Sequence, residues 1–222
     1  MAERMRITAA ENDGAAKQRM IEAATSLFSQ SGVDGVSMRA LTAAADVNLA
    51  SVNYHFGSKE ALAQTVFEAL SARVNKQRIA DIKQSVATAA QAGQPIKLKT
   101  IVAIFVEPYL GEGRAEEGRL LAQLILKHRL TPSGMTGDIV RRHFDPMARH
   151  FIEAYAKACP KVKKEDRYWR YAFMVSTVVL TVTDQAKGNR VSRLSGGLVD
   201  AVSREALRSA LIKYIVAGLA AA

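Results

Sequence analysis

The chain has 222 residues, 49% of them hydrophobic and 23% charged, and a formal net charge of +10. This composition is ordinary for a soluble protein with a buried core, and its many Ala and Leu residues favour helices. The lone cysteine, Cys159, excludes an intrachain disulfide and fits a reducing compartment. No apolar run reaches the ~20 residues that a membrane span needs.

The N-terminal segment shows neither a targeting signal nor a regular pattern. Residues 1–14 carry several charges, no apolar stretch and no helical periodicity. We therefore expect a cytoplasmic protein with no membrane partner and a disordered tail over residues 1–14. A helix is expected from Ala15 to Ser31, because apolar residues recur there at helical spacing. Gly32 follows as a residue that can take positive φ and end this helix.

Local signals predict three further helices. Ser37 is the expected N-cap of a short second helix, and Asp46 lies in a tight turn after it. Asn48 is the expected N-cap of a third helix, which Gly57 ends. Ser58 then begins a long fourth helix, expected to span at least residues 58–80.

Two short helices joined by a tight turn and braced by a longer helix form the tri-helical plan of many DNA-binding domains. On the third helix, Leu49, Val52 and Phe56 are expected to face inward. The outward side chains are then small or hydrogen-bonding, and none of them is acidic. A tri-helical bundle is not in itself a DNA-binding module, so periodicity alone leaves a purely structural role open.

The types of these side chains suit contacts with double-stranded DNA. Asn can pair with adenine in the major groove, while Tyr and His can donate to phosphate oxygens. Arg39 and Lys59 lie in first turns of helices, where the positive end of the dipole favours anions. The predicted DNA-binding residues are Arg39, Asn48, Ala50, Ser51, Asn53, Tyr54, His55 and Lys59.

The segment from Lys17 to Phe67 closely resembles the DNA-binding domain of the tetracycline-repressor (TetR) family of transcription regulators. The matching anchors are AA..LF...G, S.R.L..AA and V....V.YHF.SKE.L., which extend over about fifty residues. A TetR-type regulator binds a palindromic operator as a dimer. By this resemblance the phosphate contacts are Tyr54, His55 and Lys59, and the base-reading residues are Ala50, Ser51 and Asn53.

Two residues depart from the family pattern. Asp46 stands where the family usually has Gly, but Asp tolerates the left-handed region, so the turn should survive. Asn53 stands where Tyr is common, which suggests that it reads a base. A minor-groove arm carrying Arg4 and Arg6 is the alternative to a plain N-terminal tail.

The rest of the chain predicts more helices and no strand, so the fold class is all-α with about nine helices. We divide the chain into a tail (1–14), a helix-turn-helix domain (15–60) and a ligand-binding and dimerisation domain (61–222), with the helix over 58–80 bridging the last two. The resemblance implies a homodimer through the last two helices; ordinary core helices of a monomer are the alternative. After a continuation of the fourth helix to Ala92, the expected helices are Pro95–Leu110, Gly113–Leu130, Asp138–Cys159 with a bend at Pro146, Lys164–Lys187 and Ser203–Ala221, with loops at Thr131–Gly137 and Gly188–Asp200.

The C-terminal helices supply the apolar side chains for an effector pocket, although most of them could be plain core. Residues 1–80 carry a net charge of +1 and residues 81–222 a net charge of +9. That excess of positive charge has three possible roles: binding an anionic ligand, steering the protein toward DNA, or simply forming a solvated surface. Two segments, NLASVNYHFGSKEAL (48–62) and ACPKVKKEDRYWRYAFMV (158–175), resemble the fatty-acid-responsive TetR regulators. This resemblance implies a small lipophilic, anionic or acyl-type effector. The predicted ligand-binding residues are Phe105, Tyr109, Leu124, Phe144, Met147, Phe151, Trp169, Arg170 and Phe173.

The sequence thus predicts a ligand-responsive transcription regulator, in the first instance a repressor. Two other classes are weighed against it: an architectural or cell-division protein that binds DNA without an effector, and a helical enzyme. No catalytic residues and no cofactor are predicted. His143 and His150 would share a helical face only if the helix continued through Pro146, and they lack a third ligand, so no metal site is predicted either.

Overall fold

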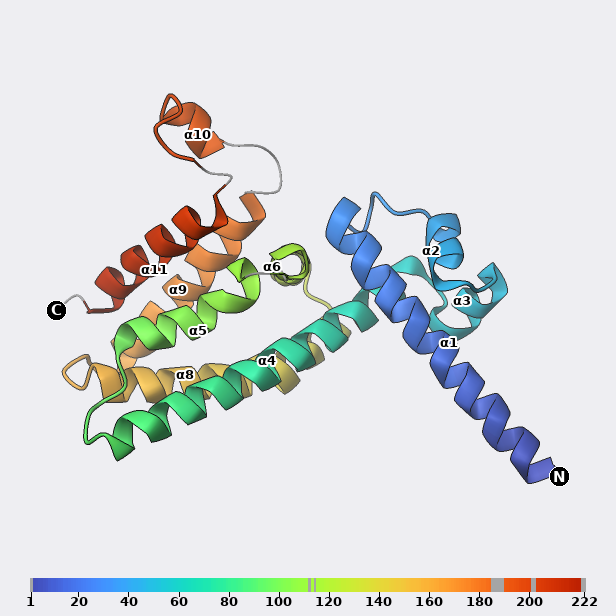
Figure 1. Cartoon of the computed structure of the whole chain (residues 1–222), viewed down its shortest axis with the longest axis horizontal. Coiled ribbons are helices and arrows are strands. Elements are labelled where there is room, and N and C mark those ends of the chain that lie inside the picture. The colour runs from blue at the N-terminus through green and yellow to red at the C-terminus, as the bar shows by residue number, and fades with distance from the viewer. Residues whose placement is uncertain (1, 112, 114, 185–189, 201–202, 221–222) are drawn as a thin grey trace. The chain divides into compact units, whose positions relative to one another are not determined.

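The computed structural model describes residues 2–111, 113, 115–184, 190–200 and 203–220 (Figure 1). Within these ranges the regular structure is helical and no strand occurs, so the predicted all-α class is confirmed. The chain forms two compact units, Met1–Leu70 and Ser71–Ala222. No helix in the described ranges is both long enough and apolar enough to cross a membrane.

The N-terminal unit is built from α1 (Ala2–Ser31), α2 (Met38–Ala45), α3 (Leu49–Phe56) and the first turns of α4 (Lys59–Gln91). Each helix buries one stripe, and together the stripes form a small continuous core. Its fully buried members include Met20, Ala24, Phe28, Leu41, Val52, Leu62, Val66 and Phe67.

Local caps fix where α2 and α3 begin and end, as the sequence predicts. The Ser37 side chain accepts a hydrogen bond from the amide of Ala40 at 3.1 Å. Asp46 adopts the left-handed conformation with φ 51°, so the turn survives without a glycine. Asn48 then caps α3, and Gly57 ends that helix with φ 74°.

Helix α1 begins earlier than the sequence predicts. It starts at Ala2, so helix replaces the tail expected over residues 2–14. The segment holds Ala9, Ala10, Glu3 and Glu11, which are good helix formers, and it contains no proline. Gly14 lies in the exposed part of this helix, where a glycine costs only about 1 kcal/mol relative to alanine.

Helix α4 is unbroken through Gln91, and the boundary between the two units falls inside it, after Leu70. The sequence places the boundary ten residues earlier, at 60/61, but also expects the fourth helix to bridge the two domains. The difference arises because residues 61–70 pack on the N-terminal core through Leu62, Val66 and Phe67.

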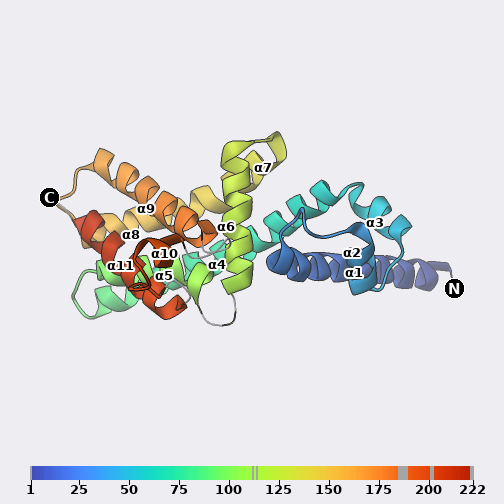
Figure 2. The same cartoon turned by 90° about the horizontal axis from the view of Figure 1, so that it is seen from above.

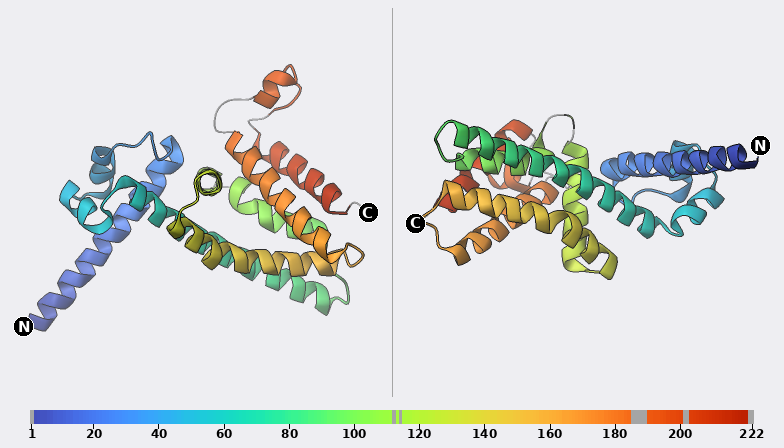
Figure 3. Two further views of the ribbon diagram at one scale, coloured as in Figure 1. Left: turned by 180° about the vertical axis from the view of Figure 1, so that it is seen from behind. Right: turned by 90° about the horizontal axis from the view of Figure 1, so that it is seen from below.

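The C-terminal unit is organised around α5 (Leu98–Leu110). Its other elements after α4 are α6 (Ala115–Leu130), α7 (Gly134–Ile139), the π-helix η1 (Val140–Phe144), α8 (Asp145–Ala158), α9 (Lys164–Asp184), α10 (Arg190–Leu194) and α11 (Arg204–Ala220). Helix α5 packs against α6, α8, α9 and α11 (Figure 2). It lies between α9 and α11 on one side and α8 and the second half of α4 on the other (Figure 3).

A glycine lets α6 approach α5 closely. A Cβ added at Gly118 would lie 2.3 Å from the carbonyl oxygen of Pro108 and 2.6 Å from the Cα of Tyr109. Real side chains do not tolerate such contacts with backbone atoms, so the spacing of the two helices requires glycine at this position.

The structure differs from the prediction in two expected loops and at the expected bend. Short helices α7 and α10 occupy parts of 131–137 and 188–200. A capping box between Ser133 and Thr136 explains the start of α7. Near Pro146 the chain does not simply bend: five residues form the π-helix η1, and α8 begins directly after it with the proline in its first turn.

Candidate functional site

The outer face of α3 is the first candidate site. Val52 is buried in the core, and this anchors the helix so that Ala50, Asn53 and Tyr54 are exposed. Tyr54 is the most open of them, with 81% of its surface exposed. An amide, a phenol and a small side chain therefore share a face that could enter a major groove.

Asn48 and Ser51, also predicted to contact DNA, interact with each other. The Asn48 Oδ1 atom accepts hydrogen bonds from the backbone amide of Ser51 at 2.8 Å and from its hydroxyl at 3.0 Å. Asn48 therefore acts as the cap of α3, and Ser51 lies half-buried against it.

Two predicted phosphate contacts have partners inside the unit instead. The His55 side chain is only 8% exposed, and its Nε2 lies 3.2 Å from Asp13 Oδ1 on α1. The Lys59 ammonium donates to the carbonyl oxygen of Val36 at 3.1 Å.

Arg39, by contrast, is exposed on the first turn of α2. Leu49, expected to face inward, is 51% exposed, because the core reaches α3 chiefly through Val52.

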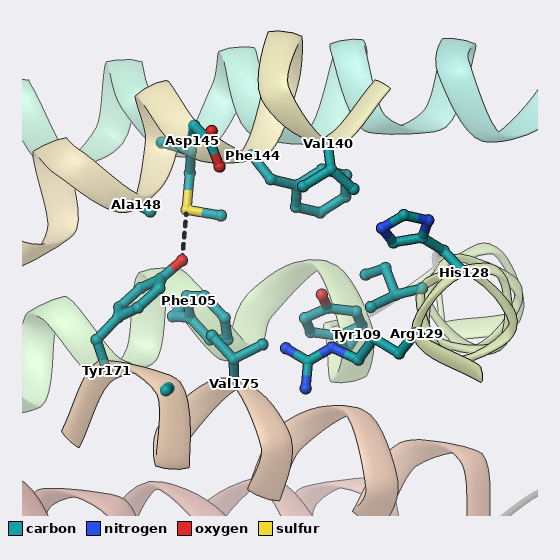
Figure 4. A pocket seen from close by; sticks show the side chains of 13 residues that line it. Phe105, Tyr109, His128, Arg129, Val140, Phe144, Asp145, Ala148, Tyr171 and Val175 are labelled. Carbon is teal, nitrogen blue, oxygen red and sulfur yellow. Dashed lines mark hydrogen bonds between the residues drawn. The ribbon is translucent and has the colours of Figure 1, made fainter. Parts of the chain in front are cut away.

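The second candidate site is a cavity of about 260 Å³ inside the C-terminal unit (Figure 4). Side chains of α5, α6, η1, α8 and α9 line it, and most of them are apolar or aromatic. This volume is near the lower end of ligand-binding clefts, ~300–1,000 Å³. The lining residues are Phe105, Tyr109, Ile125, His128, Arg129, Val140, Phe144, Asp145, Met147, Ala148, Tyr171, Ala172 and Val175.

The polar side chains of the cavity are mostly held by neighbours. The Tyr171 hydroxyl donates to Met147 Sδ at 3.8 Å, the dashed line in Figure 4. His128 Nδ1 lies 2.7 Å from the hydroxyl of Thr136, and Arg129 donates to Ser176 at 3.2 Å. Burial raises the pKa of the Tyr171 phenol far above its usual range, so this group is a neutral donor at physiological pH.

A π-helix forms one wall of the cavity. Val140 and Phe144 stand at the two ends of η1, and Asp145 follows at the start of α8. Such wide turns are uncommon and occur frequently at functional sites, because they redirect side chains that a regular helix would place elsewhere.

Four of the nine predicted ligand residues line this cavity: Phe105, Tyr109, Phe144 and Met147. Leu124 and Phe151 are buried core, and Phe151 packs edge-on against Phe105 at 5.5 Å between ring centroids.

The other three, all on α9, lie outside the cavity. Trp169 and Phe173 are 62% and 61% exposed and stack on each other with centroids 6.2 Å apart. Arg170 donates to the carbonyl oxygen of Leu219 at 2.9 Å. The face of α9 that reaches the cavity instead carries Tyr171 and Val175.

The prediction missed several lining residues. Tyr171 and Val140 follow from no local motif, since the phase of α9 and the π-turn decide their direction. His128 carries a weak signal, because a polar residue in an amphipathic helix beside an apolar pocket is a candidate for its mouth. In the described residues, no three His, Cys, Asp or Glu side chains are grouped to hold a metal ion.

Models of one protein family match both of the segments that carry these two sites. Residues 20–66 match the family described as bacterial regulatory proteins, tetR family, and residues 103–218 match the tetracyclin repressor-like C-terminal domain. The chain belongs to the TetR family. TetR-family regulators are ligand-responsive DNA-binding proteins, usually repressors, that act as dimers, and they are not enzymes.

Solved structures show the same fold across almost the whole chain. A fatty acid degradation regulator, FadR from Bacillus halodurans, is 13% identical with a TM-score of 0.57, covering 90% of this chain and 97% of its own. The hemolysin II transcriptional regulator HlyIIR is 14% identical with a TM-score of 0.55, covering 95% and 99%. A transcriptional regulator from Aquifex aeolicus VF5 is 16% identical with a TM-score of 0.53, covering 90% and 97%. The comparison with curated protein sequences gave no match.

Proposed function

We propose that this TetR-family protein is a homodimeric repressor that reads a palindromic operator through α3. A small lipophilic, anionic or acyl-type molecule bound in the cavity of the C-terminal unit would release it from DNA. The observation that carries the proposal is the outer face of α3, where Asn53 and the 81% exposed Tyr54 stand beside the buried anchor Val52.

Within this face the residues have different roles. Asn53 and Ala50 read base edges, and Tyr54 and Arg39 contact phosphates. Lys59 and His55 act indirectly. The contact of His55 with Asp13 links α3 to α1, and the hydrogen bond of Lys59 to Val36 links the start of α4 to the segment before α2. This division departs from the sequence-based prediction, in which His55 and Lys59 contact phosphates themselves.

The cavity supports a ligand-responsive regulator over a purely architectural DNA-binding protein. Four aromatic residues, Phe105, Tyr109, Phe144 and Tyr171, line it, and its polar groups are few. That lining suits a lipophilic effector. FadR from Bacillus halodurans, which shares the fold, is named as a regulator of fatty acid degradation, and this agrees with an acyl-type molecule.

The outer faces of α9 and α11 suit a second copy of this chain. Trp169, Phe173 and Leu180 follow one another along exposed α9 at helical spacing. On α11, Tyr214 is exposed among small residues that include Ala210, Ala217 and Gly218. These two helices pack together in the unit. An apolar surface of this kind is rarely left open to solvent, and a two-fold axis would pair it with itself.

Selection from a pool of random duplexes by the purified full-length protein tests the function. The expected result is a palindromic sequence whose binding weakens steeply as salt rises, because phosphate contacts release counterions. Fluorescence anisotropy with that duplex then measures affinity against a scrambled control. A protein that prefers no duplex, or whose binding does not depend on salt, would overturn the proposal.

A further inference from the structure

Three polar side chains lie buried along one face of α4 in the C-terminal unit. Ser71 is 0% exposed, and Asn75 and Arg78 are each 1% exposed. Their spacing of four and three residues places them on the same side of the helix. A buried arginine without a carboxylate is rare, because removing its charge from water is costly unless an anion compensates for it.

The partners of Arg78 are all neutral. Its guanidinium donates to the carbonyl oxygen of Phe105 at 2.5 Å and to Asn75 Oδ1 at 3.2 Å. The guanidinium carbon also lies 4.5 Å from the ring centroid of Phe105 and 4.8 Å from that of Tyr109. No acidic residue in the described part of the chain forms an ion pair with it. Carbonyl and ring contacts orient the cation, but they do not neutralise it.

Each member of the cluster also has a buried polar atom with no hydrogen-bond partner. These atoms are Ser71 Oγ, Asn75 Nδ2 and Arg78 Nε. All three can donate a hydrogen bond, and two of them can do nothing else. The group that the cluster lacks is therefore an acceptor, and the charge of Arg78 favours an anionic one.

The cluster lies against the wall of the cavity. Phe105 and Tyr109, the two rings that contact the guanidinium, are both lining residues. The positive charge of Arg78 also acts on Tyr171, a third lining residue. Burial raises the pKa of the Tyr171 phenol, and this charge partly offsets the rise. Arg78 itself is not among the lining residues, so the proposal below requires one of the two rings to turn aside when a ligand binds.

We propose that Arg78, Asn75 and Ser71 receive the carboxylate of the effector, while the apolar remainder of the effector fills the cavity. This inference rests on the proposed role of the cavity as the effector site. The two carboxylate oxygens accept from Arg78 Nε and Asn75 Nδ2, and the Ser71 hydroxyl supplies a third donor. The arrangement satisfies all three unpartnered atoms and the charge together, which a water molecule cannot do.

Ligand pairs that differ only in charge test the assignment. Decanoate is compared with 1-decanol, and 4-phenylbutyrate with 4-phenylbutanol, by calorimetry on the full-length protein without DNA. We expect at least one acid to bind about tenfold or more tightly than its alcohol. In Arg78→Met the acid and the alcohol should bind about equally, within roughly twofold. Wild-type protein that binds neither acid, or that binds each acid no better than its alcohol, overturns the assignment, as does an Arg78→Met variant that keeps the preference.

A second variant supplies the counterion from within the protein. Asn75→Asp replaces the amide that contacts Arg78 with a carboxylate of nearly the same shape. The ligand-free Tm should rise, and binding of the acid should fall about tenfold while binding of the alcohol is unchanged. Gln84→Glu, which adds the same charge at an exposed position of α4, is the matched control and should do neither. An Asn75→Asp variant with a lower Tm and undiminished acid binding contradicts the proposal.

The anion could also be inorganic, and titration with chloride and phosphate separates the two sources. If either ion raises the Tm of the wild type as much as the acids do, and Arg78→Met removes that effect, the carboxylate assignment is wrong. If neither ion does so, the carboxylate assignment stands. The calorimetry requires no operator, so its result does not depend on whether the protein binds DNA. A protein that binds acids through Arg78 but prefers no duplex refutes the repressor role alone, and a repressor released equally by acids and alcohols refutes only this inference.

Discussion

Asn53 and Tyr54 are adjacent on α3 but should contribute to DNA binding in different ways. An amide can discriminate between bases through paired hydrogen bonds in the major groove, whereas a phenol that donates to a phosphate carries no sequence information. Both side chains are exposed, so substitutions at either position should leave the core of the unit intact.

Asn53→Ala should cost about 1–3 kcal/mol for the preferred base at one operator position and little for the other bases there. Tyr54→Phe should weaken binding to all duplexes by a similar factor. Anisotropy titrations against the selected operator and its single-base variants measure both effects. Equal losses on every duplex for both variants would contradict the division of roles.

A substitution of Lys59 distinguishes a structural role of this residue from a direct contact with DNA. Its ammonium donates to the Val36 carbonyl, and a hydrogen bond to a charged group contributes about 1.5–3 kcal/mol. Lys59→Met should therefore lower the free energy of unfolding by about that amount and leave the salt dependence of DNA binding unchanged. Urea denaturation and salt titrations give the two quantities. Unchanged stability with a salt slope reduced by about 1 would show that Lys59 contacts a phosphate after all.

At the scale of the element, the signals that the sequence reveals are local ones. Ser37, Asp46, Asn48 and Gly57 act within four residues of themselves, and the structure agrees with each of them. His55 could not be predicted in the same way, because its partner Asp13 lies on a different helix. The family resemblance implied a histidine that contacts phosphate, whereas its side chain is only 8% exposed and lies against Asp13.

The cavity was harder to predict because it depends on the phase of whole helices. Helix α9 is apolar around most of its circumference near residues 172–182, so periodicity does not reveal which face turns inward. Trp169 and Tyr171 are two residues apart and therefore lie on nearly opposite faces of the helix: Trp169 is exposed and Tyr171 lines the cavity. Val140, which was not predicted, lies in a π-turn, for which the sequence shows no signal apart from the nearby Pro146.

Filling the cavity from α8 should block the effector without harming the fold. Ala148 lines the cavity and tolerates added volume only at the expense of bound ligand. Ala148→Leu should leave operator affinity unchanged and reduce effector binding about tenfold or more, which yields a repressor that is not released. Ala156→Leu, on the same helix but outside the cavity, is the control. Normal release of Ala148→Leu by the effector would mean that the ligand binds elsewhere.

At the scale of the whole molecule, function requires two copies of the chain. A palindromic operator is read by two recognition helices related by a two-fold axis. The exposed aromatic residues of α9 and the small residues of α11 are the proposed contact. Residues 81–222 also carry a net charge of +9, and in the proposed function a field of this sign would assist the approach of the dimer to DNA.

Phe173→Glu should disrupt this contact, because it places a charge in an apolar interface, at a position that is 61% exposed in the single chain and so demands no refolding. The expected result is a monomer with an unchanged helical spectrum and greatly weakened operator binding. Light scattering after size exclusion measures the mass. Lys157→Glu, an exposed change on α8, should remain dimeric. A Phe173→Glu variant that stays dimeric would place the interface on another surface.

Gly118 has a consequence for how such a regulator can change its specificity. The residue itself is not part of the lining, yet it sets the separation of α5 and α6, and these two helices carry Phe105, Tyr109, Ile125, His128 and Arg129. Any larger side chain there must push the helices apart and widen the chamber between them. If the effector binds in this chamber as proposed, the size of molecule that fits is tuned at a position outside the lining.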